Sequence, residues 1–224
     1  MSNKVFIVPH DFTTVADVAF NHAIRAAESV GADIYLLHVV SKDKQIKEAN
    51  LKLDSIIEQT ETSEKVKLHK YVRIGNIFDD IGDFAKEHSA ELIFMGTHGA
   101  SGWQHVTGSH ALKVITHSDV PFVVVQEKEP NENGYDDIVV PLDLHQETKQ
   151  KLAIVANMAK YFDSRVHIVI PDETDEFLKN KLLANITFAN KFFSERSIDV
   201  KATVAPKSGF DKEIVKHAIG VDAD

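Results

Sequence analysis

Glycines are concentrated in one short stretch of the chain, at a spacing typical of phosphate-binding loops. The motif Gly-Thr-His-Gly occupies 96–99, and Gly-Ser follows at 108–109. An apolar run precedes the motif and an amphipathic segment, 111–115, follows it, which indicates a strand, a glycine-rich loop and a helix. Glycines allow the backbone to turn tightly and approach an anion, while free N–H groups at the helix start point toward it. The stretch therefore predicts a nucleotide or another phosphate-bearing ligand, although it is neither a Walker A loop nor Gly-x-Gly-x-x-Gly.

Apolar runs alternate with amphipathic segments throughout the first part of the chain. Short β-branched runs bounded by Pro or Gly indicate buried parallel strands, and apolar residues at helical spacing indicate the helices between them. We expect strands at 5–8, 34–40, 66–74, 92–95 and 121–126, and helices near 16–27, 51–57, 77–88 and 111–115. Five strands joined by helical crossovers predict an α/β fold with a doubly wound open parallel sheet.

The pattern begins again after a polar, turn-rich segment at 127–134, and the offset between the two copies is constant. Three pairs of segments share this offset: Val8-Pro9-His10-Asp11 with Val140-Pro141-Leu142-Asp143, Ala32-Asp33-Ile34 with Ser164-Arg165-Val166, and Phe78-Asp79 with Phe210-Asp211. The shared offset predicts a tandem duplication. We expect a complete domain at 1–128, a linker at 129–136 and a partial domain at 137–224.

The second copy ends where its fourth strand would begin, so a second glycine loop and the last two strands are missing. Either the natural second copy is degenerate or the chain is shortened, and we favour a shortened chain. Three strands alone would leave the first strand of this copy without a partner on one side.

Composition excludes several classes of protein. The net charge of −9 argues against nucleic-acid and anionic-membrane partners, because surfaces that bind phosphate backbones are usually basic. The absence of cysteine excludes disulfides and thiolate metal sites. No apolar run approaches the ~20 residues of a membrane span, and the N-terminus lacks the apolar region of a signal peptide. We expect a cytoplasmic protein.

Twelve histidines raise the question of a metal site. His10, His38 and His98 fall near the carboxyl ends of expected strands, but no His-Glu-x-x-His or other close ligand spacing occurs. We therefore predict no transition-metal site. Efficient catalysis is not expected either, since no serine lies in a Gly-x-Ser-x-Gly elbow and 95–110 contains no Lys or Arg to clamp a phosphoryl group.

These motifs resemble those of the universal stress protein family in its tandem two-domain form. Nucleotide-binding members of that family carry Gly-x-x-Gly, nine residues and then Gly-Ser/Thr. Both ends are present here, but the spacer 100–107 has eight residues. The resemblance implies an adenine nucleotide alpha hydrolase-like sheet with strand order 3-2-1-4-5. Ligands of such sheets bind where the strand order reverses, here between the first and fourth strands.

The resemblance also implies which residues would bind the nucleotide. Asp11 would accept hydrogen bonds from the ribose or adenine, and Val39 would offer backbone groups to the adenine edge. Gly108 and Ser109 would donate to the phosphates. The family usually has a small residue at the position of His10. An alternative role for Asp11 is to cap the helix that begins near Thr13. The implied set is Pro9, His10, Asp11, Val39, Met95, Gly96, His98, Gly99, Gly108 and Ser109.

Three functions remain open. The chain is expected to be a stress-response regulatory protein that binds ATP or AMP, with Mg²⁺ if the ligand is a triphosphate. The shorter spacer favours instead an interaction module of the same fold that binds no nucleotide, and a slow ATP hydrolase is the third reading. The apolar segment Val120–Gln126 lies at an expected sheet edge and predicts a homo-oligomer, unless the charged segment after it covers that edge.

Overall fold

The computed structural model describes residues 3–97, 114–116, 118–142, 144 and 148–224. The chain divides into two compact units, 1–130 and 131–224, and each is described by itself. Among the described residues, no helix combines the length and the apolar character that a membrane span requires.

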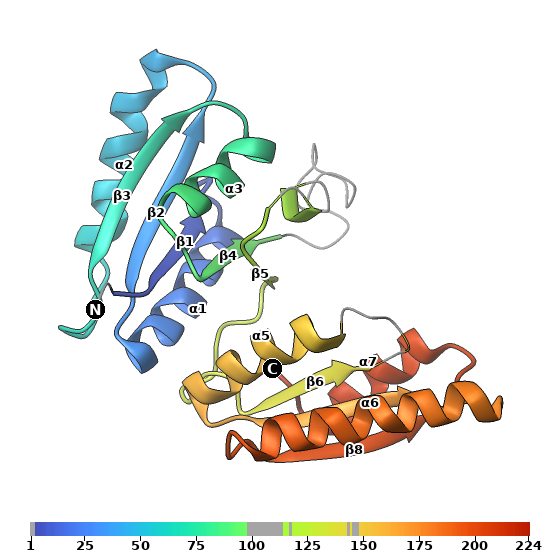
Figure 1. The fold of residues 1–224 in the computed structure, drawn as a ribbon. Helices are drawn as coiled ribbons and strands as arrows, with labels where there is room; N and C mark the ends of the chain where they lie inside the picture. The colour runs from blue at the N-terminus through green and yellow to red at the C-terminus, as the bar shows by residue number, and fades with distance from the viewer. Residues whose placement is uncertain (1–2, 98–113, 117, 143, 145–147) are drawn as a thin grey trace. The chain divides into compact units, whose positions relative to one another are not determined.

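The first unit is built on a five-stranded parallel sheet with the order β3-β2-β1-β4-β5 (Figure 1). This is the α/β fold and the strand order predicted from the sequence. Its elements are β1 (Val5–Pro9), α1 (Thr14–Val30), β2 (Asp33–Val40), the 3-10 helix η1 (Asp43–Gln45), α2 (Ile46–Glu58), β3 (Leu68–Ile74), α3 (Ile77–Glu87), β4 (Leu92–Gly96) and β5 (Phe122–Val125). Both expected edge strands, β3 and β5, lie at the edges of the sheet.

Strand β1 is central because its side chains are apolar on both faces. Phe6, Ile7 and Val8 are fully buried. On one face, Ile7 packs in a cluster with Ile81 of α3. On the other, α1 packs against β4 and β5. Helices on both faces explain the continuous apolar runs in these strands.

Local sequence signals set the ends of the helices. Gly31 follows α1 with φ of +71°, a left-handed conformation that favours glycine, and its N–H donates to the carbonyl of Ala27. The side chain of Asn76 accepts hydrogen bonds from the N–H groups of Phe78 and Asp79 and so caps α3. Gly31 thus ends α1, and Asn76 begins α3.

The second unit contains a three-stranded parallel sheet with the order β6-β7-β8 among its described residues. Its elements are β6 (Asp137–Pro141), α5 (Thr148–Phe162), β7 (Arg165–Pro171), α6 (Glu176–Ser194), β8 (Val200–Ala205) and α7 (Phe210–Gly220). Strand β6 lies at one edge of this sheet among the described residues. Beside this edge, the backbone N–H of Asp224 donates to the carbonyl of Asp137 at 3.1 Å.

The two sheets share one register. Val5 pairs with Asp33 in the first unit, and Asp137 pairs with Arg165 in the second, with the same separation along the chain in both cases. The next strand pairs agree as well: the separation from Ile34 to its partner Leu68 equals that from Val166 to Val200. Residues that are separated by the constant sequence offset therefore occupy corresponding places in the two sheets.

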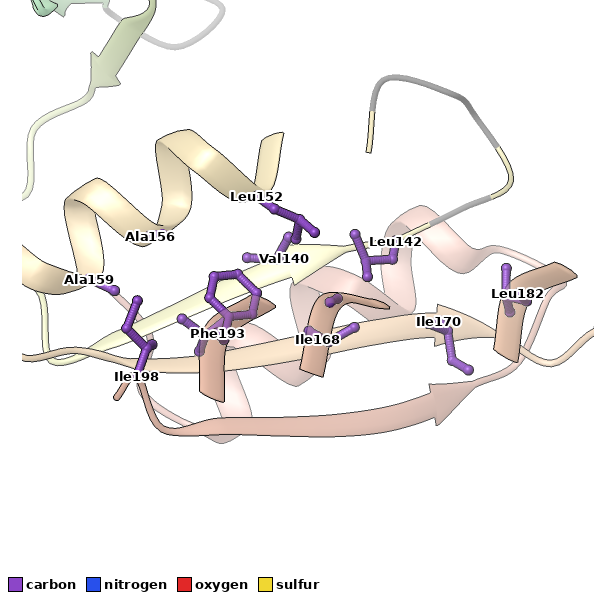
Figure 2. Close-up of a cluster of buried hydrophobic side chains, with 12 residues drawn as sticks. Val140, Leu142, Leu152, Ala156, Ala159, Ile168, Ile170, Leu182, Phe193 and Ile198 are labelled. Carbon is purple, nitrogen blue, oxygen red and sulfur yellow. The ribbon is translucent and has the colours of Figure 1, made fainter. Parts of the chain in front are cut away.

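The core of the second unit lies between its sheet and two helices (Figure 2). Leu152 and Ala156 of α5 and Phe193 of α6 pack on the strand residues Val140 and Ile168. Helix α7 contacts all three strands. Its His217 lies against His167 of β7, on the face of the sheet opposite to the core that α5 and α6 cover. The wide apolar stripe of α6 is only partly buried: Phe193 is enclosed, whereas Phe177 is 76% exposed.

We predict that Phe193→Ala destabilises the second unit by about 3–5 kcal/mol, because it removes a fully buried ring from a packed core. Urea unfolding followed by circular dichroism measures the change. Phe177→Ala on the same helix is the matched control, and its unfolding midpoint should stay near that of the wild type. Equal losses in the two variants would contradict the packing described here.

Candidate functional site

A small hollow lies at the carboxyl ends of β1, β2 and β4, where the strand order reverses. Its volume is about 60 Å³, whereas ligand pockets typically measure roughly 300–1,000 Å³. The hollow that the described residues enclose is therefore smaller than a typical ligand pocket. The hollow is lined by Pro9, His10, Asp11, Ala16, Leu37, His38, Val39, Ile77, Ile81, Met95 and Gly96.

Six of the ten predicted site residues line this hollow together. One ends β1, two directly follow it, one comes from β2 and two come from β4: Pro9, His10, Asp11, Val39, Met95 and Gly96. The other four, His98, Gly99, Gly108 and Ser109, lie outside the described residues, as does Asp143 in the second unit. Sequence reasoning did not assign Ile77 and Ile81 to the site, although their spacing of four in an expected helix places them on one face.

His10 is held by hydrogen bonds at both ring nitrogens. Nε2 lies 3.1 Å from Oδ1 of Asp17 on α1, and Nδ1 accepts from the N–H of Phe12 at 3.2 Å. With Nδ1 as acceptor, the neutral ring carries its proton on Nε2. Burial lowers the pKa of His10 below its ordinary value, against the opposing effects of Asp17 and Asp11. The ring is therefore neutral at pH 7 and is anchored toward α1.

The backbone of β1 continues into a left-handed residue that the sequence did not predict. Phe12 has φ of +65°, which is uncommon for a residue with a bulky side chain. Its ring centre lies 4.4 Å from that of His38, and Lys52 Nζ lies 5.2 Å from the same phenyl ring. His38 Nδ1 is 2.7 Å from the carbonyl of His10, to which it donates. These contacts hold the strained turn beside the hollow.

Asp11 is exposed at the end of β1 and is ordered by its neighbour. Its Oδ1 accepts hydrogen bonds from the N–H of Thr13 at 3.2 Å and from the Thr13 hydroxyl at 2.5 Å. Thr13 itself is the N-cap of α1, and its side chain makes no capping hydrogen bond to the first turn. The alternative role of Asp11 as the helix cap is therefore wrong, since Asp11 fixes the residue before the helix instead.

Gly96 is required by packing. A Cβ atom at this position would lie 2.4 Å from the backbone carbonyl oxygen of Val15 on α1. The glycine thus lets the end of β4 approach the first turn of α1. After it, the N–H of Thr97 donates to the carbonyl of Val125, which keeps the chain in register with β5.

Among the described residues, no group of three or more His, Asp or Glu side chains is placed to hold a metal ion.

Comparison with known proteins agrees with this geometry. The model of the universal stress protein family matches residues 2–126. This match covers more than half of the chain, and the chain therefore belongs to the universal stress protein family.

Individual relatives show the extent of the likeness. Universal stress protein G of Shigella flexneri is 27% identical over 142 residues, covering 55% of this chain and 99% of that protein. Universal stress protein MJ0531 of Methanocaldococcus jannaschii is 29% identical over 140 residues, covering 55% of this chain and 82% of that protein. The crystal structure of a universal stress protein from Archaeoglobus fulgidus covers 100% of this chain and 85% of its own, with a TM-score of 0.76 and 17% identity, which shows a shared fold.

We predict that Gly96→Ala destabilises the first unit by about 1–3 kcal/mol, because the added methyl group overlaps backbone atoms of α1. Urea unfolding measures the change. Gly220→Ala is the control, since a Cβ atom there meets nothing within 4 Å, and its stability should be unchanged or slightly higher. A Gly96→Ala protein as stable as the wild type would contradict the close approach.

We also predict that His10 contributes to acid sensitivity. Its pKa is lower in the folded state than in the unfolded chain, so the unfolded state binds the proton more readily. The contribution of His10 to the free energy of unfolding is fully present above the ordinary histidine pKa of about 6.5. It is lost as the pH falls through the lower pKa of His10 in the folded state. His10→Gln should therefore lose less stability than the wild type between about pH 7.5 and pH 5, measured by urea unfolding. Parallel losses in the two proteins would show that His10 does not titrate in this way.

Proposed function

We propose that the first unit binds an adenine nucleotide, ATP or AMP, at the carboxyl ends of β1, β2 and β4. The observation that carries this proposal is that Asp11, just after β1, Val39 of β2 and Gly96 of β4 line one hollow at the point where the strand order reverses. Open α/β sheets bind their ligands at this point. Membership of the universal stress protein family supports the same reading, because the glycine motif resembles that of its nucleotide-binding members.

Each strand end has a part in the proposed complex. The free lone pairs of the Asp11 carboxylate are available to ribose hydroxyls, since its bonds to Thr13 use only Oδ1. The backbone at Val39 is available to the adenine edge, and Met95 offers an apolar surface to the base. The phosphates would bind Gly99, Gly108 and Ser109, with Mg²⁺ accompanying ATP and held mainly by water. His10 lies beside the base with its ring anchored to Asp17.

A regulatory role fits this arrangement better than efficient turnover. No Lys or Arg occurs among the residues that line the described hollow. Phosphoryl transfer relies on such cations, or on metal ions, to stabilise its transition state. We therefore propose a stress-response protein that senses a nucleotide, and we expect phosphate release from ATP to be no faster than in Asp11→Ala.

The second candidate is an interaction module, and the position of β5 favours it. Strand β5 is at the edge of the five-stranded sheet, and the side chain of Val124 is 47% exposed. An exposed apolar edge strand can pair with another chain. We propose self-association through Val120–Gln126, which is compatible with nucleotide binding at the opposite side of β4. The shared strand registers further support a tandem arrangement of one complete and one partial family domain.

We predict that isothermal titration calorimetry detects ATP or AMP binding and that Asp11→Ala weakens it about 10- to 100-fold. The loss corresponds to removing hydrogen bonds to a charged group, at about 1.5–3 kcal/mol. Asp83→Ala, at an exposed carboxylate of α3 that does not line the hollow, should bind as the wild type does.

Gly108→Val tests the phosphate side of the same site, and its affinity should fall as well. The absence of heat with both nucleotides would exclude the nucleotide proposal and leave the interaction module. Unchanged affinity in both variants would place the nucleotide elsewhere in the chain.

A further inference from the structure

A buried polar cluster lies in the second unit, on the face of the sheet that α7 covers. His167 Nε2 of β7 lies 2.6 Å from Oδ1 of Asp137 on β6, and Arg165 Nη2 donates to the other carboxylate oxygen at 2.7 Å. Asp137 and His167 are both buried, 6% and 9% exposed. Arg165 can only donate, and it occupies one oxygen of Asp137, so the other oxygen accepts a hydrogen bond from His167 Nε2.

This arrangement leaves a histidine nitrogen with a free lone pair. When Nε2 of the neutral His167 ring donates to Asp137, Nδ1 of the same ring is an acceptor. His167 Nδ1 and His217 Nε2 are both buried and have no hydrogen-bond partner among the described residues. The two rings are adjacent, with centres 5.8 Å apart. A buried polar atom without a partner is costly, so two such atoms on neighbouring rings call for a ligand that satisfies both.

The fold itself does not require polar groups at these positions. The residues that the repeat places at the same positions in the first unit are Val5, Tyr35 and Ala85, all of which belong to the cluster packed under α3. The second unit has Asp137, His167 and His217 in their places. The corresponding face of the second sheet thus carries a carboxylate and two imidazoles where the first sheet has hydrophobic packing.

We propose that His167 Nδ1 and His217 Nε2 together bind one divalent transition-metal ion, Zn²⁺ or Cu²⁺, with water completing the coordination. Asp137 is the positioning residue, since a carboxylate that accepts from the second nitrogen of a metal-binding imidazole orients the ring and raises its basicity. This site is independent of the nucleotide proposed for the first unit.

The ring separation and the ligand type both favour such an ion. Zinc binds imidazole nitrogens at about 2.0 Å, which places the centres of two bound rings about 5 to 6 Å apart. The two unpartnered atoms are imidazole nitrogens, which suit Zn²⁺ and Cu²⁺. Ions that prefer carboxylate oxygens, such as Ca²⁺ and Mg²⁺, are therefore disfavoured.

Two substitutions remove the ligands while restoring the residues of the first unit. His217→Ala introduces the counterpart of Ala85, and His167→Tyr introduces the counterpart of Tyr35, so both variants are expected to fold. We predict that the full-length protein, stripped with EDTA, binds Zn²⁺ in a calorimetric titration and that each variant weakens this binding at least about tenfold. His69→Ala is the matched control, because His69 lies in the first unit and also has a buried nitrogen for which the described residues offer no hydrogen-bond partner. Its Zn²⁺ affinity should equal that of the wild type.

Electron paramagnetic resonance with Cu²⁺ distinguishes ligands from positioning residues. The wild type should show coupling to two imidazole nitrogens that is reduced in His217→Ala. Asp137→Asn should keep the two-nitrogen pattern with an affinity lowered about 10- to 100-fold. Circular dichroism establishes that each variant is folded. A wild type that binds no Zn²⁺, or Zn²⁺ affinity that is unchanged in folded His167→Tyr and His217→Ala, would overturn the proposal and indicate a buried water between the two rings.

Discussion

The structure of the first unit depends on the backbone pairing of β1 with a parallel strand on each side. β1 pairs with β2 from Val5 to Pro9, and with β4 at Phe6 and Ile7. This double pairing is stable because the side chains of Phe6, Ile7 and Val8 are buried by helices on both faces. It also brings the carboxyl ends of three strands to one edge of the sheet. The hollow, the left-handed turn at Phe12 and the exposed Asp11 all follow from where β1 ends.

In the second unit, the strand that corresponds to β1 pairs with a described strand on one side only. β6 repeats the register of β1 toward β7, whereas on its other side the described residues place Asp224 against the start of the strand and pair no strand with it. One face keeps an apolar core around Phe193. Under α7, by contrast, Asp137 and His167 are buried, and the helix itself buries none of its residues. Backbone register and apolar packing on one face are thus sufficient to retain the sheet, which frees the other face for polar groups.

Both units bury histidines, and the hydrogen bonding of the ring nitrogens differs between them. His10 uses both ring nitrogens in hydrogen bonds, to Asp17 and from the N–H of Phe12, and it stays neutral because of burial. His167 uses one nitrogen for Asp137 and leaves the other without a partner among the described residues. The first arrangement anchors a strand end, whereas the second leaves a lone pair that suits a ligand.

The order and type of the elements could be predicted because periodicity is a local property. Runs such as Leu92–Met95, the stop at Gly31 and the constant offset between the two copies are visible in the chain without any contact. Part of the candidate site was predictable for the same reason, since the strand ends carry Asp11, Val39 and Gly96. The packing reason for Gly96 was not, because the carbonyl of Val15 that excludes a side chain comes from the neighbouring helix.

By itself, therefore, the sequence determined the α/β class, the parallel strands and the family motif, all of which depend on patterns along the chain. Only the tertiary structure decided that Asp11 orders Thr13 and does not cap α1, that Phe12 turns left-handed against His38, and that His217 lies against His167. His167 and His217 are far apart in the sequence, and no spacing rule connects them. Their contact exists because β7 and α7 pack on one another, and such packing is a property of the folded chain.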